Sequence, residues 1–187
     1  MNTFLPPQAC WLKTYYLVRA GFAFAWLALA VTVAAHSAPL AALLLVVYPA
    51  WDAVANLLDA ARSGGLANNR SQLINAVVSI AVAVAIAVSL PAMRAVLAVF
   101  GAWAILAGLL QLATALRRRA GGVAQGQWAM ILSGAQSALA GAFFMVQARG
   151  AAEPTIATVA GYAGFGGFYF LVSALLLMRA ARKLRTN

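Results

Sequence analysis

The chain alternates long apolar runs with short polar breaks, and this pattern predicts its secondary structure. A helix that crosses a bilayer needs about 20 mostly apolar residues. Six runs reach that length, at residues 15–35, 40–61, 72–90, 92–116, 127–148 and 155–178. Glycine, proline, asparagine and arginine fill the breaks between them, as is typical of turns. We therefore expect six transmembrane helices.

The apolar runs are continuous rather than alternating, which favours helices over a membrane barrel. Barrel strands show a two-residue period over about ten residues, whereas Ala, Leu and Val fill these runs without that period. A helix also satisfies its backbone hydrogen bonds within one segment, as lipid requires. The predicted fold class is an all-α polytopic membrane protein, with residues 1–187 as a single transmembrane domain.

Parts of the predicted helices resemble one another. Residues 48–58 and 100–110 both carry an aromatic residue, then Ala-Trp, then Ala and Leu-Leu at matching positions, and residues 162–166 form a weaker third copy. We interpret this as three parallel two-helix hairpin repeats with a basic C-terminal tail. The repeats cover about residues 12–62, 70–119 and 125–180, and the tail covers 179–187. The alternative is chance similarity between helices rich in Ala and Leu.

Composition supports a membrane protein and excludes several other classes. Of 187 residues, 65% are hydrophobic and 9% are charged, against roughly 25% charged in an ordinary soluble domain. Such a chain cannot cover the surface of a soluble enzyme, and it is too apolar for a disordered protein. With one cysteine, Cys10, it is not a disulfide scaffold either.

The basic residues predict the orientation in the membrane. Of 13 Lys and Arg residues, only Arg94 and Arg149 fall on one side of the predicted topology. The other side holds Lys13, Arg19, Arg62, Arg70, Arg117, Arg118, Arg119, Arg179, Arg182, Lys183 and Arg185. Because basic loops stay inside, we expect a bacterial inner (plasma) membrane protein with both termini cytoplasmic. Basic residues at helix ends suit anionic lipid, so we expect membrane lipid, and no nucleic acid, as a partner.

The second predicted helix carries a polar stripe, with Asp52 about ten residues, or roughly 15 Å, inside the membrane. A carboxylate at that depth needs a partner. The candidate ion-pair site comprises Arg19, Tyr48, Asp52, Asn56 and Asp59. Arg19 has the reach to pair with Asp52 or with Asp59. One interpretation is a proton- or ligand-responsive pair. The other, which we favour, is a structural pair that orders the first hairpin.

Two further sets of residues have the spacing of helix-packing faces. Small and polar residues inside the third and fifth helices let backbones approach closely, with a polar pathway as the alternative. This set comprises Asn75, Ser79, Ser133, Gln136, Ser137 and Gly141. The last helix interleaves glycine with aromatic residues, which suits a partner helix, a lipid tail or close packing within the chain. That face comprises Gly161, Gly164, Phe165, Gly167 and Phe168.

The chain has little material for catalysis. One His, one Cys and three acidic residues provide neither a nucleophile with its base nor a metal cluster. We expect no enzyme, no cofactor and no metal, with a bound lipid allowed. We also expect a homo-oligomer or a membrane-protein partner.

The same helices carry a family resemblance. Residues 102–108 leading to Arg117, and 126–134 followed by Ser137 and Gly141, resemble the even- and odd-helix motifs of HdeD-like membrane proteins, a short-repeat family. Residues 19–21 and 48–52 resemble that family's Arg-Gly start and aromatic–Asp pattern. The resemblance implies three two-helix repeats and a role like that of the family's namesake, which is an acid-resistance membrane protein.

Three functions remain open on this reading. The first is a non-enzymatic inner-membrane bundle for stress resistance or for stabilising a partner, which predicts a compact core. The second is an accessory subunit of a photosynthetic or respiratory complex. The third is a small transporter or channel, which predicts that Asp52, Asn75 and Gln136 line one cavity.

Overall fold

The computed structural model describes residues 7–186, with side chains described for residues 10–183, and this part of the chain is all-helical. The main helices are α1 (Pro7–Thr32), α2 (Ala38–Arg62), α3 (Arg70–Ser89), α4 (Met93–Ala120), α5 (Gln127–Gln147) and α6 (Ile156–Thr186). Short 3-10 turns, η1 (Ala34–His36) and η2 (Leu66–Asn68), lie in the first two connections. All six helices are long and apolar enough to cross a membrane, which confirms the predicted number.

Some helix ends differ from the expected ones. α1 begins at Pro7 instead of near residue 15, α4 continues to Ala120 instead of stopping near 116, and α6 continues to Thr186 instead of stopping near 178. The end of an apolar run marks the edge of the bilayer. A helix can continue beyond that edge, because Arg and Lys are good helix formers. Their long side chains reach the polar boundary from a helix that continues.

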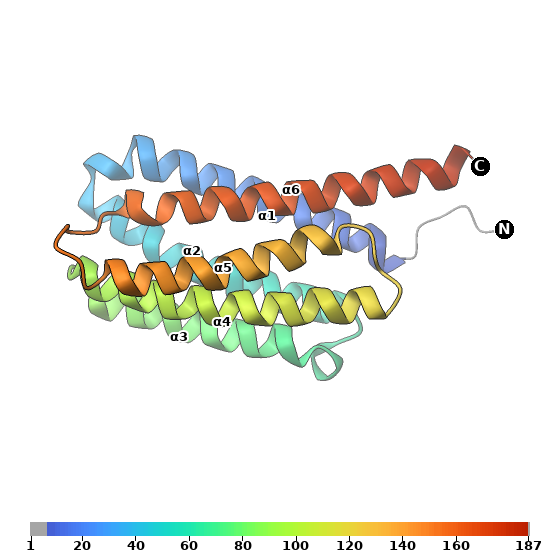
Figure 1. Ribbon diagram of the computed structural model, residues 1–187, viewed down its shortest axis with the longest axis horizontal. Coiled ribbons are helices and arrows are strands. Elements are labelled where there is room, and N and C mark those ends of the chain that lie inside the picture. The colour runs from blue at the N-terminus through green and yellow to red at the C-terminus, as the bar shows by residue number, and fades with distance from the viewer. Residues whose placement is uncertain (1–6, 187) are drawn as a thin grey trace.

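Figure 1 shows the six helices running lengthwise beside one another, and the contacts between them close into a ring. Each helix packs on its neighbours in sequence, and α6 closes the ring against α1. The most extensive packing joins α4 to α5, α6 to α1 and α2 to α3, which are the pairs that cross from one expected hairpin to the next. The two helices within each expected hairpin pack on each other less extensively, so the hairpin repeat stays a prediction.

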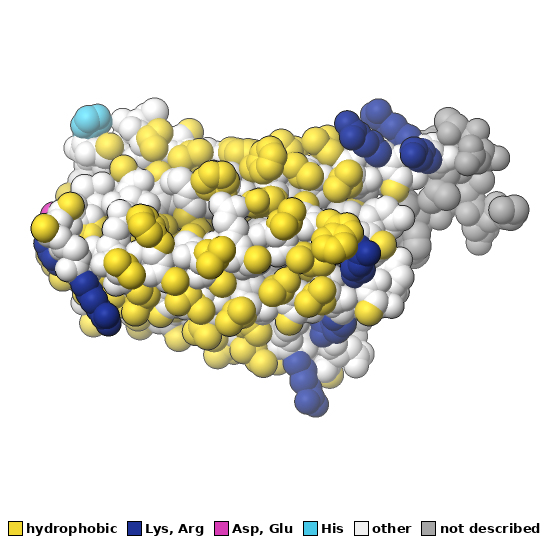
Figure 2. Space-filling view, in the orientation of Figure 1, with side chains coloured by type: hydrophobic (Ala, Val, Ile, Leu, Met, Phe, Trp, Pro, Cys, Tyr) yellow, Lys and Arg dark blue, Asp and Glu magenta, His cyan; other side chains and the backbone are white. Residues whose placement is uncertain are grey.

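Charged side chains gather at the two ends of the bundle (Figure 2). α1 begins and α6 ends at the same end, which we call the terminal end. Most basic side chains in view lie there, whereas His36 lies at the opposite end. At that opposite end Arg94 Nε donates to Glu153 at 2.8 Å, and both side chains are exposed. The middle of the visible face is apolar, as a bilayer requires.

Glycines bring α4 and α5 into backbone contact. A Cβ atom added at Gly108 would lie 2.6 Å from the carbonyl oxygen of Gly134, and one added at Gly101 would lie 2.8 Å from that of Gly141. Small residues at a helix crossing allow this approach in a membrane, where packing replaces the hydrophobic effect as the force between helices. The backbones of α4 and α5 are therefore in direct contact at these glycines.

Candidate functional site

A polar network surrounds Asp52 at the centre of the ring. Its Oδ1 accepts a hydrogen bond from Arg19 Nη2 of α1, which also forms an ion pair with it. Its Oδ2 accepts from Asn56 Nδ2 at 3.0 Å, Asn75 Nδ2 at 3.2 Å and Ser79 Oγ at 2.9 Å. Asp52 is 5% exposed. Helices α1, α2 and α3 are therefore tied together through one carboxylate, and Arg19 pairs with Asp52 rather than with Asp59.

Aromatic groups hold the other side of the Arg19 guanidinium. Its Nη1 donates to the Tyr15 hydroxyl at 2.9 Å, and its Cζ lies 4.4 Å from the centroid of the Phe170 ring. A cation over an aromatic face is attracted by the ring quadrupole, more strongly where water is excluded. Arg19 is thus held from three sides and links α6 to the network around Asp52.

A second ion pair lies nearer the terminal end. Asp59 of α2 pairs with Arg118 of α4, and the two side chains are 2% and 7% exposed. Trp11 Nε1 and Ser63 Oγ each donate to Asp59 Oδ1 at 3.1 Å. A buried charge pair needs such additional hydrogen bonds to offset the loss of hydration. Both acidic residues of α2 therefore have basic partners on other helices.

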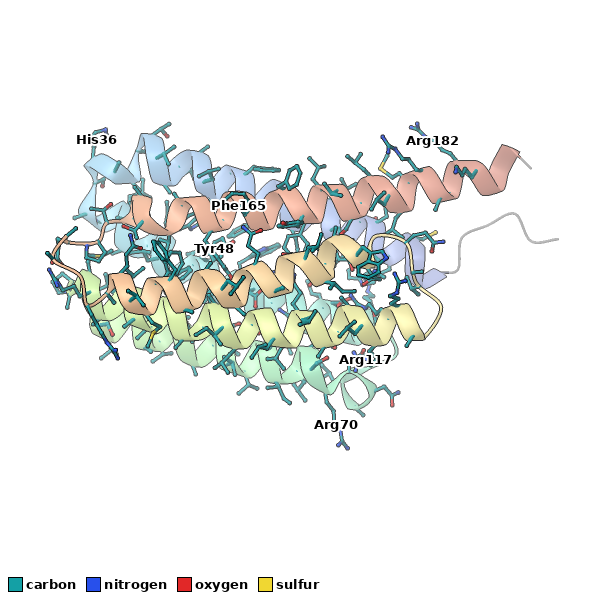
Figure 3. All side chains as sticks on the ribbon, viewed as in Figure 1. His36, Tyr48, Arg70, Arg117, Phe165 and Arg182 are labelled. Carbon is teal, nitrogen blue, oxygen red and sulfur yellow. The ribbon has the colours of Figure 1, made fainter. Side chains whose placement is uncertain are left out.

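The interior contains a cavity of about 260 Å³ on the side of the Asp52 network that faces α5 and α6. All six helices contribute to its wall, including Asp52, Asn75 and Gln136. Gly161 and the 58% exposed Phe165, both on α6, lie on the wall and also reach the surface. The cavity therefore reaches the surface beside Gly161 and Phe165 of α6, and Figure 3 labels Phe165 on that helix.

Several polar groups on this wall lack a partner. Asn75 is 6% exposed, and its Oδ1 is fully enclosed and accepts no hydrogen bond. Among the residues that the structure describes, the Tyr48 hydroxyl and the Gln136 amide also form no hydrogen bond to protein. A buried acceptor without a donor costs about 1–3 kcal/mol. The Tyr48 hydroxyl and the Gln136 amide can therefore each donate a hydrogen bond to a molecule in the cavity or accept one from it.

A smaller polar cavity of about 30 Å³ lies between the two ion pairs. Arg19, Asn75, Gln111 and Phe170 line both cavities and form the partition between them. Its volume is enough for about two water molecules. The small cavity therefore lies between the large cavity and the buried ion pair of Asp59 and Arg118, and polar side chains line it.

The small and polar residues of α3 and α5 that the sequence singled out have different surroundings. Ser137 Oγ donates to the backbone carbonyl of Ala104 at 2.9 Å and lies 2.7 Å from the Tyr162 hydroxyl. Ser133 and Ser137 join Asn75 and Gln136 on the cavity wall. Ser79 is fully buried in the Asp52 network, and Gly141 packs against α4.

The glycine and aromatic residues of α6 have different surroundings from one another. A Cβ added at Gly164 would lie 3.1 Å from a Leu27 side-chain carbon, and one added at Gly167 would lie 3.1 Å from the Ala23 Cβ, so these glycines seat α6 on α1. No atom lies within 4 Å of a Cβ added at Gly161. Phe165 and Phe168 are 58% and 54% exposed.

Sequence reasoning gave no site role to Trp103, Arg118 or Phe170. Trp103 Nε1 donates to Ser79 Oγ at 2.9 Å and so supports the Asp52 network. A signal for Trp103 was present, because the repeat alignment places it opposite Trp51. A signal for Arg118 was also present, since it follows Ala115 at the spacing of one helical turn on the inward face of α4.

Comparison with known proteins identifies one related stretch. Residues 74–146 match the model of the family described as a short repeat of unknown function (DUF308). The stretch begins in α3, includes all of α4 and ends one residue before the end of α5. No curated protein and no solved structure matches the chain. The fold indicates a helical membrane protein, and its residues 74–146 are similar to that short repeat of unknown function.

Proposed function

We propose that this protein is a non-enzymatic inner-membrane protein that binds a small molecule inside its six-helix ring, as a small transporter or carrier does. The observation that supports it most is the placement of Asp52, Asn75 and Gln136 on one cavity of about 260 Å³. A transporter predicts this arrangement, whereas a purely structural bundle predicts a filled core. Binding sites in helical bundles commonly lie between the helices in this way.

In this proposal the Asp52 network is the frame of the binding site. Four side chains already donate to its carboxylate, so Asp52 has little capacity left for a ligand. Its effect is to fix the positions of Arg19 and Asn75, which both face the cavity. Rigid support of this kind is what holds a binding group in place.

The stress-resistance role implied by the HdeD-like resemblance is a second candidate. The short-repeat match over residues 74–146 favours it, as does the completeness of the Asp52 network, which suits a stabilising bundle. It predicts that a deletion strain survives acid challenge less well than its parent, and that the gene restores survival. Normal survival of the deletion strain would count against this role but not against ligand binding.

Purification in mild detergent tests the binding proposal. Gly161→Leu places a side chain at the cavity mouth, where no atom lies within 4 Å of the added Cβ. Gly21→Leu is the matched control, because Gly21 of α1 also has no neighbour within 4 Å of its Cβ position and lines neither cavity. Solvent extracts of the wild-type protein and of the Gly21→Leu variant should contain a small molecule at near-stoichiometric amount.

The Gly161→Leu extract should contain much less of that molecule. Equal amounts from all three proteins would mean that any bound molecule lies outside the cavity, which would contradict the proposal. A defined membrane complex that co-purifies with an empty cavity would instead favour the accessory-subunit function.

A further inference from the structure

The large cavity is elongated along the helices. Its lining residues follow one face of α6 from Thr158 to Phe170 and one face of α5 from Ser133 to Phe144. At a rise of 1.5 Å per residue, these faces extend about 16–18 Å along the helix axes. On the scale of the engineered cavity of about 150 Å³ that holds the six carbons of benzene, a volume of about 260 Å³ takes about ten non-hydrogen atoms. That number of atoms fills such a length as an unbranched chain and not as a compact molecule.

The polarity of the wall changes along its length. Arg19, Asp52 and Gln111 line the section towards the terminal end, whereas Ala140 and Phe144 line the section towards the opposite end. This assignment follows because α4 ends and α5 begins at the terminal end. The wall therefore matches an amphiphile whose polar group lies towards the terminal end and whose chain lies towards the opposite end.

Two polar side chains without a partner lie near the middle of the cavity. Tyr48 is ten residues from the start of α2 at the opposite end, and Gln136 is eleven residues from the end of α5 there, so both lie about 15–17 Å from that end. A Cβ added at Gly166 would lie 3.7 Å from the Tyr48 hydroxyl oxygen, so this hydroxyl lies beside α6. Among the described residues, the fully enclosed side-chain atoms without a partner are Trp51 Nε1 and Asn75 Oδ1. The unpartnered groups of Tyr48 and Gln136 are therefore open to the cavity that they line.

The charges on the wall favour a neutral ligand. Arg19 and Asp52 are the Lys, Arg, Asp or Glu residues among the described residues on this wall, and they are paired with each other. The cavity reaches the surface beside Gly161 and Phe165, within the apolar span of α6. A charged molecule would be costly to bring through such an entrance, whereas a neutral amphiphile is already dissolved in the lipid outside it.

We propose that the large cavity binds a neutral single-chain lipid with a hydroxyl head group, that is, a long-chain alcohol. The head group lies at the height of Tyr48 and Gln136, which hydrogen-bond to it, and the chain lies along α5 and α6 against Ala140 and Phe144. The inference rests on the proposed function, because it names the class of molecule that the same cavity binds. A carrier of such a lipid needs a partner for the head group inside the membrane, where hydrocarbon offers no hydrogen bond.

Two probes that differ only in the head group test the hydrogen bonds. The full-length protein is placed in lipid nanodiscs, and the binding of a terminally fluorinated decanol and of the matching fluorodecane is measured by fluorine NMR at equal concentrations in the lipid. Tyr48→Phe removes the hydroxyl group and keeps the ring. It should weaken the binding of the decanol relative to the fluorodecane by about three- to tenfold, the range of one neutral hydrogen bond. Gln136→Leu should change the ratio in the same direction, and an unchanged ratio in both variants would overturn the inference.

The matched controls lie outside the large cavity and outside the Asp52 network. Tyr16→Phe also removes a buried tyrosine hydroxyl, but Tyr16 lines the small cavity and not the large one, and its hydroxyl has a partner on α5. Gln147→Leu also removes an amide from α5, and Gln147 lines neither cavity. Both controls should keep the wild-type ratio, and a drop of equal size in them would refute the assignment to the cavity wall.

A compact alcohol tests the shape of the ligand. Decanol and 1-adamantanol have the same number of carbon atoms and the same head group. Unlabelled decanol should displace the fluorinated decanol at a several-fold lower concentration in the lipid than 1-adamantanol does. Equal or better displacement by 1-adamantanol would contradict a chain-shaped ligand.

The outcomes separate this inference from the proposed function. If Gly161→Leu blocks both fluorinated probes but Tyr48→Phe and Gln136→Leu leave their ratio unchanged, the inference fails and the proposed function stands. The same holds if neither probe binds while solvent extracts contain another molecule that Gly161→Leu removes. If Gly161→Leu changes neither the binding of the probes nor the extracts, both proposals fail.

Discussion

Removal of the Asp52 carboxylate should destabilise the protein far more than removal of an exposed one. Asp52→Leu leaves Arg19, whose side chain is 14% exposed, without its ionic partner inside the membrane. It also removes the acceptor for Asn56, Asn75 and Ser79. Breaking one side of a buried pair costs about 3–5 kcal/mol. Tyr15 and Phe170 still contact Arg19, so we expect a loss near the lower end, about 3 kcal/mol.

The third ion pair supplies a control for this prediction. Glu153→Gln at the opposite end breaks the pair between Arg94 and Glu153, whose side chains are 43% and 63% exposed. Arg94 also donates to the carbonyl oxygens of Gly150 and Ala151, so it keeps partners. Exposed pairs contribute about 0–1 kcal/mol, and we expect this variant to lie in that range.

The free energy of unfolding is measured for both variants by reversible unfolding in mixed micelles, followed by tryptophan fluorescence. A double variant, Arg19→Met with Asp52→Leu, should recover the part of the loss that comes from the unpaired Arg19 charge, whereas Asn56, Asn75 and Ser79 still lack their acceptor. If Asp52→Leu costs no more than Glu153→Gln, or if the double variant is no more stable than the single one, our reading of the Asp52 network is wrong.

Three other changes test the packing and the orientation. Gly108→Ala should lower stability by about 1–3 kcal/mol through overpacking against α5, whereas Gly21→Ala, in open space, should be neutral or stabilising in the same unfolding assay. Gly126→Ala should also destabilise the protein by about 1–2 kcal/mol, because Gly126 has φ +79° and its added Cβ would lie 2.8 Å from the Ser173 carbonyl oxygen. A neutral result in the unfolding assay would contradict this geometry. A reporter enzyme that is active only outside the cytoplasm should be inactive when fused after the last residue and active when inserted beside Arg149, and the reverse pattern would invert the topology.

The helices were predictable from sequence because each membrane span is recorded locally, in about 20 consecutive residues. The pairing of charges was not predictable to the same degree, because it depends on which faces of distant helices meet. Arg19 had two acidic residues within reach, and the sequence does not say which one its side chain faces. Arg118 stands between Arg117 and Arg119 and reads as part of a basic helix end, yet its place on the inward face pairs it with Asp59.

The cavity illustrates the same limit. Asn75 and Gln136 have the spacing of packing residues, and the same spacing serves a cavity wall equally well. The difference arises from backbone distances around the ring: α4 and α5 meet at Gly108 and Gly134, whereas α5 and α6 pack less extensively. The large cavity lies beside that weaker contact, and no short stretch of sequence records it.

The central claim is that a small molecule occupies the large cavity. The most direct test is an electron-density map of the protein crystallised from its own membrane lipids, at a resolution that shows ordered water. We predict continuous density in the large cavity, against the side chains of Tyr48, Trp103 and Tyr162. A cavity closed by side chains, or one that holds separate water peaks alone, would contradict the claim.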